Sequence, residues 1–213
     1  MAPWTTRRQV LVRAGTAALV GAPACAWMAS PHAAGSLRPT PSQSEGPFYP
    51  VEFPADSDAD LLRTGDLVYR HGVETWVEGR VSDVAGVPVK DAVVEIWQGD
   101  HNGHYHHPGD GNLADKAFQG FGRSTVQADG TYRFRTLRPV RYAARAPHIH
   151  VKVRLGRREI LTTQLYVAGD AQNASDPLLS ALRDPADRAA LTVRFEAPQA
   201  GGPLKAWFPI VLG

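Results

Sequence analysis

The chain has 213 residues, of which 43% are hydrophobic and 21% charged, so it is long and apolar enough to bury one substantial core. Its 23 Lys and Arg against 21 Asp and Glu give no sign of the basic face that nucleic-acid binding requires. The single cysteine excludes both a disulfide framework and a cysteine metal cluster.

The first 34 residues are predicted to be an export signal. Arg7 and Arg8 precede an apolar stretch over residues 14–28, and small residues that suit cleavage follow. The paired arginines indicate the twin-arginine type, so we expect a periplasmic or secreted protein. Gly21 and Pro23 interrupt the stretch, which argues against a stable membrane span in the mature form. The segment holds three basic residues, no acidic residue and the only cysteine, so the mature net charge is expected to be about −1.

The remaining chain is predicted to be an N-terminal arm followed by one β domain. Residues 35–70 are rich in Pro, Ser and Asp and show little periodicity, which is typical of an ordered arm. Strands are predicted over residues 75–81, 91–97, 130–137, 148–155, 160–167, 191–196 and 204–212, and one short helix over 177–183. This pattern predicts an all-β fold, with residues 71–213 forming a single antiparallel β-sandwich of the transthyretin kind and few short helices.

Two histidines on one predicted strand are the strongest indication of function. His148 and His150 flank Ile149, and side chains two residues apart on a strand point to the same face. Neutral imidazole is the commonest metal ligand among side chains, so a metal site is expected at this face. Tyr142 and Arg145 precede the pair on the approach to the strand.

Tyrosines near these histidines indicate which metal the site takes. The phenol has an ordinary pKa of about 10, so it becomes a phenolate ligand at neutral pH only beside a strongly charged cation. Two histidines with two tyrosines therefore favour Fe(III) over Zn(II). Tyr142 is one candidate, and Tyr105, in the loop after the strand predicted at 91–97, is the other.

The loop around Tyr105 also contains His104, His106 and His107. Three further histidines could form a second metal site, but an exposed, flexible loop explains them more simply. We therefore assign these three histidines no role.

A series of motifs spans nearly all of the chain after the signal. In order, they occupy residues 40–49, 94–98, 103–105, 118–123, 132–139, 147–150, 163–166 and 169–170. Each motif is weakly specific alone. Their joint order resembles the intradiol ring-cleavage dioxygenases, the family of protocatechuate 3,4-dioxygenase and catechol 1,2-dioxygenase.

The resemblance implies an enzyme that uses O2 to open catechol-type rings into cis,cis-muconate-type products. It implies that a non-haem Fe(III) is held by four side chains: Tyr105, Tyr142, His148 and His150. The expected catalytic residues are Tyr142, which a catecholic substrate displaces, Arg145, which matches the family's active-site arginine, and Gln164, which matches a glutamine beside the metal. The expected partners are the substrate and O2, with a homodimer as a candidate assembly.

Two departures from the family pattern concern the substrate pocket. Only five residues separate Tyr142 from His148, and Ala143 and Ala144 stand where an aromatic residue often follows the second tyrosine. We expect a shorter and more open pocket wall. The substrates of the known family members are therefore not assigned to this chain.

Three other functions remain open on the sequence. The hairpin over residues 86–94 is typical of many transthyretin-like sandwiches, so a non-catalytic exported binding module is one alternative. A periplasmic copper or zinc binder that uses the histidines of residues 101–107 is another. A two-histidine, one-carboxylate Fe(II) oxygenase is disfavoured, because no acid stands beside His148 and His150.

Overall fold

The structure, a computed structural model, describes residues 36–213. The predicted twin-arginine signal on residues 1–34 lies outside these residues. Within residues 36–213, no helix is long and apolar enough to cross a membrane.

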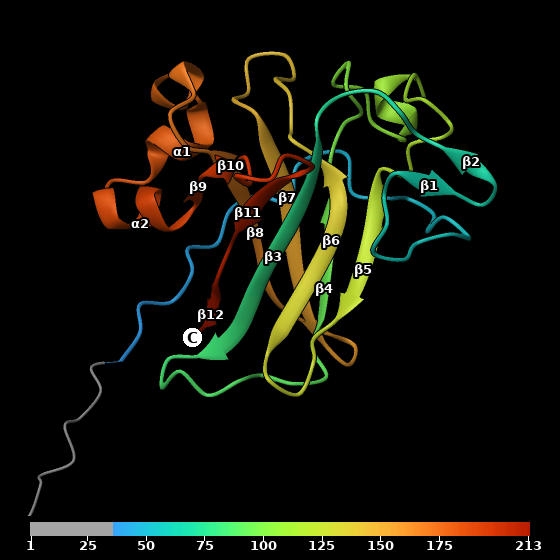
Figure 1. Ribbon diagram of the computed structural model, residues 1–213. Coiled ribbons are helices and arrows are strands. Elements are labelled where there is room, and N and C mark those ends of the chain that lie inside the picture. The colour runs from blue at the N-terminus through green and yellow to red at the C-terminus, as the bar shows by residue number, and fades with distance from the viewer. Residues whose placement is uncertain (1–35) are drawn as a thin grey trace, which may run out of the picture. The chain divides into compact units, whose positions relative to one another are not determined.

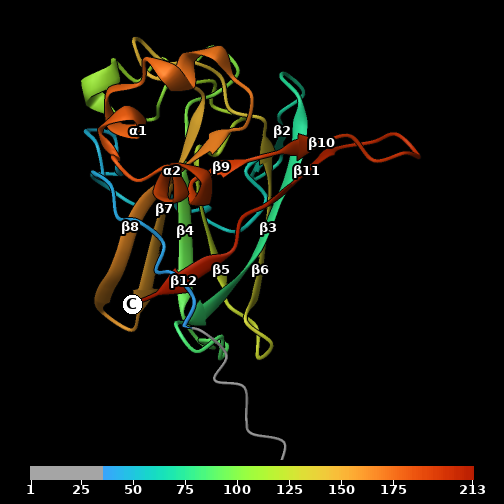
Figure 2. The ribbon, with the colours of Figure 1, turned by 90° about the vertical axis from the view of Figure 1, so that its left-hand side faces the viewer.

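The described chain is built around two five-stranded sheets (Figures 1 and 2). In the first sheet, β3 (Glu74–Asp83) pairs with β6 (Thr131–Leu137) on one edge and with β11 (Leu204–Trp207) and β12 (Ile210–Leu212) on the other, and β10 (Phe195–Glu196) pairs with β11. The second sheet has the order β5 (Phe121–Thr125), β4 (Val93–Trp97), β7 (His148–Leu155), β8 (Arg158–Val167) and β9 (Thr192–Val193). The remaining elements are the hairpin of β1 (Arg63–Thr64) and β2 (Leu67–Val68), the helices α1 (Pro177–Ala181) and α2 (Pro185–Ala190), and the 3-10 turns η1 (Pro108–Asp110) and η2 (Ala171–Ala174).

The main core lies between the inner faces of the two sheets. Alternate residues of β3, including Val77 and Val81, are buried there, and β7 contributes Ile149 and Val151 from the other side. This alternation sends the intervening residues of β7 to the outer face. The first six residues of β7 are nevertheless all buried, so a second layer must cover its outer face.

That second layer is the N-terminal arm, which Figure 2 shows in blue running past β8. The Thr40 N–H donates to the carbonyl of Val211 (2.9 Å), and the Gln43 N–H donates to the carbonyl of Thr162 (2.9 Å). Farther along, the arm covers a small buried cluster of aromatic residues on the outer face. The cluster consists of Phe48, Trp97, Tyr105 and Phe121, with Tyr49 and Tyr142 packed against it.

Most of the predicted strands are confirmed. Those over residues 75–81, 91–97, 130–137, 148–155 and 160–167 are β3, β4, β6, β7 and β8, and the helix predicted at 177–183 is α1. The chain is mostly β with few short helices, as predicted. β1, β2, β5 and α2 were not predicted, and the strand predicted at 191–196 is divided into β9 and β10, which belong to different sheets.

The predicted all-antiparallel pairing is wrong. β11 and β12 run parallel to β3, and β9 runs parallel to β8. The connection from β8 to β9 passes through η2, α1 and α2, which is long enough to return the chain in the same direction. The strand predicted at 204–212 is interrupted at Phe208 and Pro209, because proline has no N–H to donate, and its two halves both pair with β3.

Candidate metal centre

His148 and His150 lie side by side on the outer face of β7. Both side chains are buried, and their Nε2 atoms are 3.1 Å apart. Nδ1 of His148 lies 2.6 Å from the carbonyl oxygen of Ala146, and because a carbonyl only accepts, Nδ1 carries the proton and Nε2 keeps a free lone pair. Two nitrogens bound at a right angle to one ion about 2.1 Å away would be about 3 Å apart, so the pair fits a shared metal.

Two tyrosines join this histidine pair. The ring centroid of Tyr105 is 6.0 Å from that of His150 and 5.5 Å from that of Tyr142. Tyr105 is buried, and Phe48 stacks on its ring at 4.7 Å. Tyr142 is half-buried, in a turn closed by the Arg145 N–H, which donates to the Tyr142 carbonyl (2.8 Å). The structure thus gathers the four predicted ligands, with Tyr105 the enclosed tyrosine and Tyr142 the more accessible one.

Burial sets the protonation of these groups. Burial, together with the nearby Arg145 cation, lowers the pKa of His148 to about 4, and it holds the pKa of His150 well below its ordinary value. Both imidazoles are therefore neutral at physiological pH, which is the form that binds metals. Burial also raises the pKa values of Tyr105 and Tyr142, so only a strongly charged cation could displace their protons.

The donor set narrows the choice of metal. Among residues 36–213, no three of His, Cys, Asp or Glu are gathered so that they could hold an ion, the histidines of the 101–107 loop included. The phenols of Tyr105 and Tyr142 are therefore the candidates for further protein ligands to a metal at His148 and His150. Imidazole with phenolate oxygen fits Fe(III) better than a soft or weakly acidic metal.

Arg145 and Gln164 meet beside the histidines. Gln164 lies directly opposite His150 in the pairing of β7 with β8. A terminal nitrogen of Arg145 donates to the side-chain oxygen of Gln164 (2.5 Å) and to the Tyr166 hydroxyl (2.9 Å). The Gln164 amide in turn donates to the backbone carbonyl of Ser44 in the arm (2.8 Å). The guanidinium is thus held in one orientation next to the predicted ligands.

Asp176 completes this network and was not predicted. Its carboxylate is fully buried and accepts from Nε of Arg145 (2.8 Å), from the Ala146 N–H (2.8 Å) and from the N–H groups of Leu178 and Leu179 at the start of α1. Sequence reasoning could have marked it as a helix cap before Pro177, but nothing in the sequence links it to Arg145.

Replacing Asp176 with asparagine is expected to destabilise the fold by about 3 kcal/mol at pH 7, because it leaves the Arg145 cation partly buried without its counter-charge. Burial alone would raise the pKa of Asp176, but Arg145 and the backbone donors hold it below its ordinary value. The stabilisation is thus present above the unfolded pKa of about 3.9 and is lost as the pH falls through the lower, folded value. Urea unfolding across this pH range should show that the difference in free energy of unfolding between wild type and variant shrinks as the pH falls.

Asp184 provides a matched control for this experiment. It caps α2 as Asp176 caps α1 and also pairs with an arginine, Arg38, but on the exposed surface. Asp184→Asn should cost much less stability, since exposed ion pairs contribute little. Equal losses in the two variants would contradict the importance of the buried pair.

Sequence reasoning also missed the aromatic contacts around the predicted ligands. Trp97 lies opposite His150 in the pairing of β4 with β7, and their rings stack at 4.8 Å with an angle of 10°. Gly46 adopts a left-handed backbone conformation (φ 75°), and a Cβ there would lie 3.2 Å from Cε1 of His150. The arm thus forms one wall of the site, which no local sequence pattern indicates.

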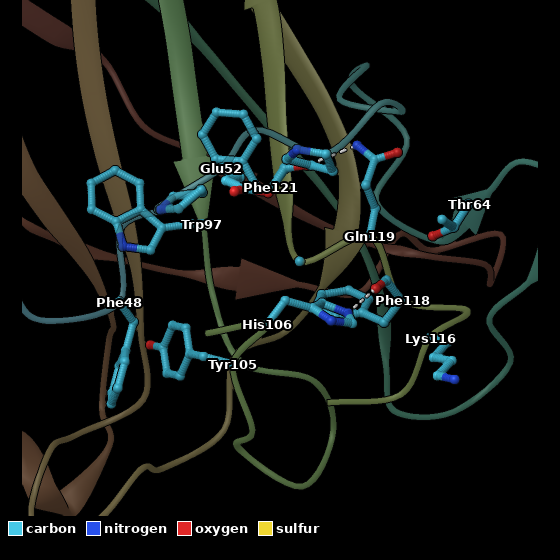
Figure 3. A pocket seen from close by; sticks show the side chains of 13 residues that line it. Phe48, Glu52, Thr64, Trp97, Tyr105, His106, Lys116, Phe118, Gln119 and Phe121 are labelled. Carbon is cyan, nitrogen blue, oxygen red and sulfur yellow. Dashed lines mark hydrogen bonds between the residues drawn. The ribbon is translucent and has the colours of Figure 1, made fainter. Parts of the chain in front are cut away.

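A pocket of about 200 Å³ lies next to this wall (Figure 3). Phe48, Trp97 and Tyr105 lie along one side of it, and Gln119, Thr64 and Lys116 lie on the other. Of the four predicted ligands, only Tyr105 lines it. His106 also lines the pocket, and its Nε2 is 2.5 Å from the carbonyl oxygen of Phe118. His104 and His107 are half-buried.

A two-sheet β fold with a buried histidine pair and two tyrosines on one outer face is the arrangement expected of a ring-cleaving dioxygenase. Residues 44–212 match a protein-family model described as a dioxygenase. The chain belongs to the intradiol ring-cleavage dioxygenase family, and it is therefore an oxidoreductase.

Individual relatives agree with this assignment. The protocatechuate 3,4-dioxygenase beta chain of Burkholderia cepacia is 34% identical, over 78% of this chain and 76% of that one. Hydroxyquinol 1,2-dioxygenase of Rhodococcus opacus is 31% identical over 62% of this chain, which spans about half the length of that relative (48%). The solved dioxygenase domain of a dioxygenase and carbohydrate-binding fusion from Streptomyces sp. SirexAA-E superposes with a TM-score of 0.63 at 33% identity, covering 82% of this chain and 98% of that one.

Proposed function

We propose that this chain is a non-haem Fe(III) intradiol dioxygenase that opens catechol-type rings with O2 to cis,cis-muconate-type products. Tyr105, Tyr142, His148 and His150 would hold the iron. The observation that carries the proposal is the 3.1 Å separation of the two histidine Nε2 atoms beside both tyrosines. The names of the relatives, which include protocatechuate, hydroxyquinol and catechol dioxygenases, support a substrate with adjacent ring hydroxyls.

The bound iron would act as a Lewis acid that draws electron density from the substrate ring. The protein's own contribution follows from how its residues are held. Tyr142 is the more accessible tyrosine, so its Oη, which would be a phenolate with iron bound, is the group placed to take a proton from a substrate hydroxyl. Arg145, fixed by Asp176, Gln164 and Tyr166, presents a cation that stabilises negative charge on the substrate.

Export, domain layout and assembly complete the proposal. Residues 1–34 would direct the protein through the twin-arginine pathway to the periplasm or the exterior, residues 35–70 would form the arm, and residues 71–213 the catalytic sandwich of transthyretin type. A homodimer is the proposed assembly. Twin-arginine export carries folded protein, so iron could be loaded before copper and zinc compete for the site.

The test begins with the colour and iron content of the purified protein. A ferric tyrosinate centre should give a broad visible absorption and about one iron per chain, whereas a zinc or copper binder or an empty binding module should not. Catechol, hydroxyquinol and protocatechuate should then give ring-opened products, followed by ultraviolet absorbance, with one O2 consumed per ring. A colourless protein that leaves all three unchanged would refute the proposal.

A further inference from the structure

Lys152 is a buried lysine that the proposed reaction does not use. It lies on the outer face of β7, two residues after His150 and therefore on the same side. Its side chain is only 3% exposed, and lysines are almost never buried to this degree unless they are paired. Nζ forms ion pairs with Glu45 and with Glu159 (3.1 Å) and lies 3.7 Å from the ring centroid of Tyr49.

The contacts with Glu45 and Tyr49 hold the N-terminal arm at two points. Glu45 and Tyr49 belong to the arm, whereas Glu159 lies on the neighbouring strand, β8. The Tyr49 hydroxyl is fixed in addition by Glu95, to which it donates at 2.7 Å. Lys152 therefore ties the arm to the second sheet through one ion pair and one cation–π contact.

The arm residues between these two points contact the metal centre. Gly46 lies against His150, where even a Cβ atom would approach its ring to 3.2 Å. Phe48 stacks on Tyr105 at 4.7 Å and meets Tyr142 edge-on at 5.3 Å. Three of the four predicted ligands are thus touched by the segment that Lys152 holds at both ends.

We propose that Lys152 is a positioning residue for the metal centre, acting through the arm by holding Gly46 and Phe48 against His150, Tyr105 and Tyr142. The inference rests on the proposed function, since it concerns how firmly iron is retained. Mutating residues that contact the ligands but do not bind the metal typically changes metal affinity by about 10–100-fold. Lys152 holds two such residues, Gly46 and Phe48, in place together.

Lys152→Met keeps the length and apolar stem of the side chain and removes its charge. We expect the full-length variant to fold, because the carboxylates left without a partner, Glu45 and Glu159, have side chains 42% and 46% exposed and remain solvated by water. In the metal-free form, hydrogen exchange at the amides of residues 44–49 should rise. In the iron-loaded form, the tyrosinate absorption should shift, and iron should be lost to a chelator about 10-fold faster or more. Lys152→Arg, which restores the charge, should recover most of the wild-type retention.

Arg133 on the other sheet is the matched control. It pairs with Glu78 (2.9 Å) and lies 3.6 Å over the ring of Trp76, so Arg133→Met removes one ion pair and one cation–π contact that involve no residue of the segment 44–49. It should leave the spectrum and the iron release unchanged. Glu45→Gln, a milder change at the half-exposed partner, should reproduce part of the Lys152→Met effect.

The outcomes separate this inference from the function on which it rests. A wild-type protein without tyrosinate absorption defeats the proposed function and the inference with it. A wild-type protein with the absorption, together with a Lys152→Met variant of unchanged spectrum and iron release, overturns the inference alone. Equal iron loss from Arg133→Met and Lys152→Met also overturns it, because the effect would then be one of general stability.

Discussion

His148→Ala is expected to abolish stable iron binding. Its Nε2 lies 3.1 Å from that of His150, and its ring is held by the hydrogen bond from Nδ1 to the Ala146 carbonyl, so the substitution removes a nitrogen that is oriented toward the proposed site. Removing a residue that only contacts a metal ligand already weakens metal binding by about 10–100-fold. Loss of a side chain that binds the metal itself should exceed that range. Iron per chain, measured by elemental analysis after dialysis, should fall close to zero, and the visible absorption should disappear.

A histidine outside the site distinguishes this result from a general effect of removing imidazole. His71 is exposed and stacks on His101, away from the histidine pair. His71→Ala should retain the iron and the absorption of the wild type. If His148→Ala kept both as well, the assignment of His148 as a ligand would be wrong.

Tyr142→Phe is expected to separate binding of the metal from turnover. Tyr105, His148 and His150 would remain to hold iron, so the variant should still load. The lost phenolate oxygen is the proposed proton acceptor, and a positioned acid or base contributes about 10²–10⁴-fold to a rate, so kcat should fall by that order. Steady-state ring opening, with iron content measured on the same samples, checks both halves of the prediction.

Tyr105→Phe should behave differently. Tyr105 is buried beneath Phe48, whereas Tyr142 is half-buried, so we expect Tyr105 to be the permanent ligand. Its loss should remove both iron and colour. Equal iron retention in the two phenylalanine variants, or normal turnover in Tyr142→Phe, would contradict the assigned roles.

The sequence predicted those parts of the site that depend on local geometry. The spacing of His148 and His150 on a strand is enough to place both imidazoles on one face, and the structure confirms that they are adjacent. The tyrosines came from different reasoning. Phenolate chemistry made Tyr105 and Tyr142 candidates, but they lie far from each other in the chain, so only the family resemblance assigned both to one ion. Their roles as ligands remain predictions.

Contacts made by separate segments could not be predicted from the sequence. Asp176 follows Arg145 by thirty-one positions, and Glu45 precedes Lys152 by more than a hundred, so no periodic pattern relates either pair. The same holds for β11 and β12, whose parallel pairing with β3 depends on the path of the chain between the sheets. Local alternation predicts a strand but says nothing about the direction of its neighbour.

The seam between Thr40 and Val211 links the order of synthesis to the placement of the arm. Thr40 donates its N–H to the Val211 carbonyl at 2.9 Å, and its hydroxyl oxygen accepts from the Val211 N–H at 2.8 Å, so the first part of the arm is secured by a strand made 171 residues later. Until that strand has left the ribosome, this end of the arm lacks its anchor. The cradle for the proposed ion is therefore expected to close late, after the chain between Thr40 and Val211 has emerged.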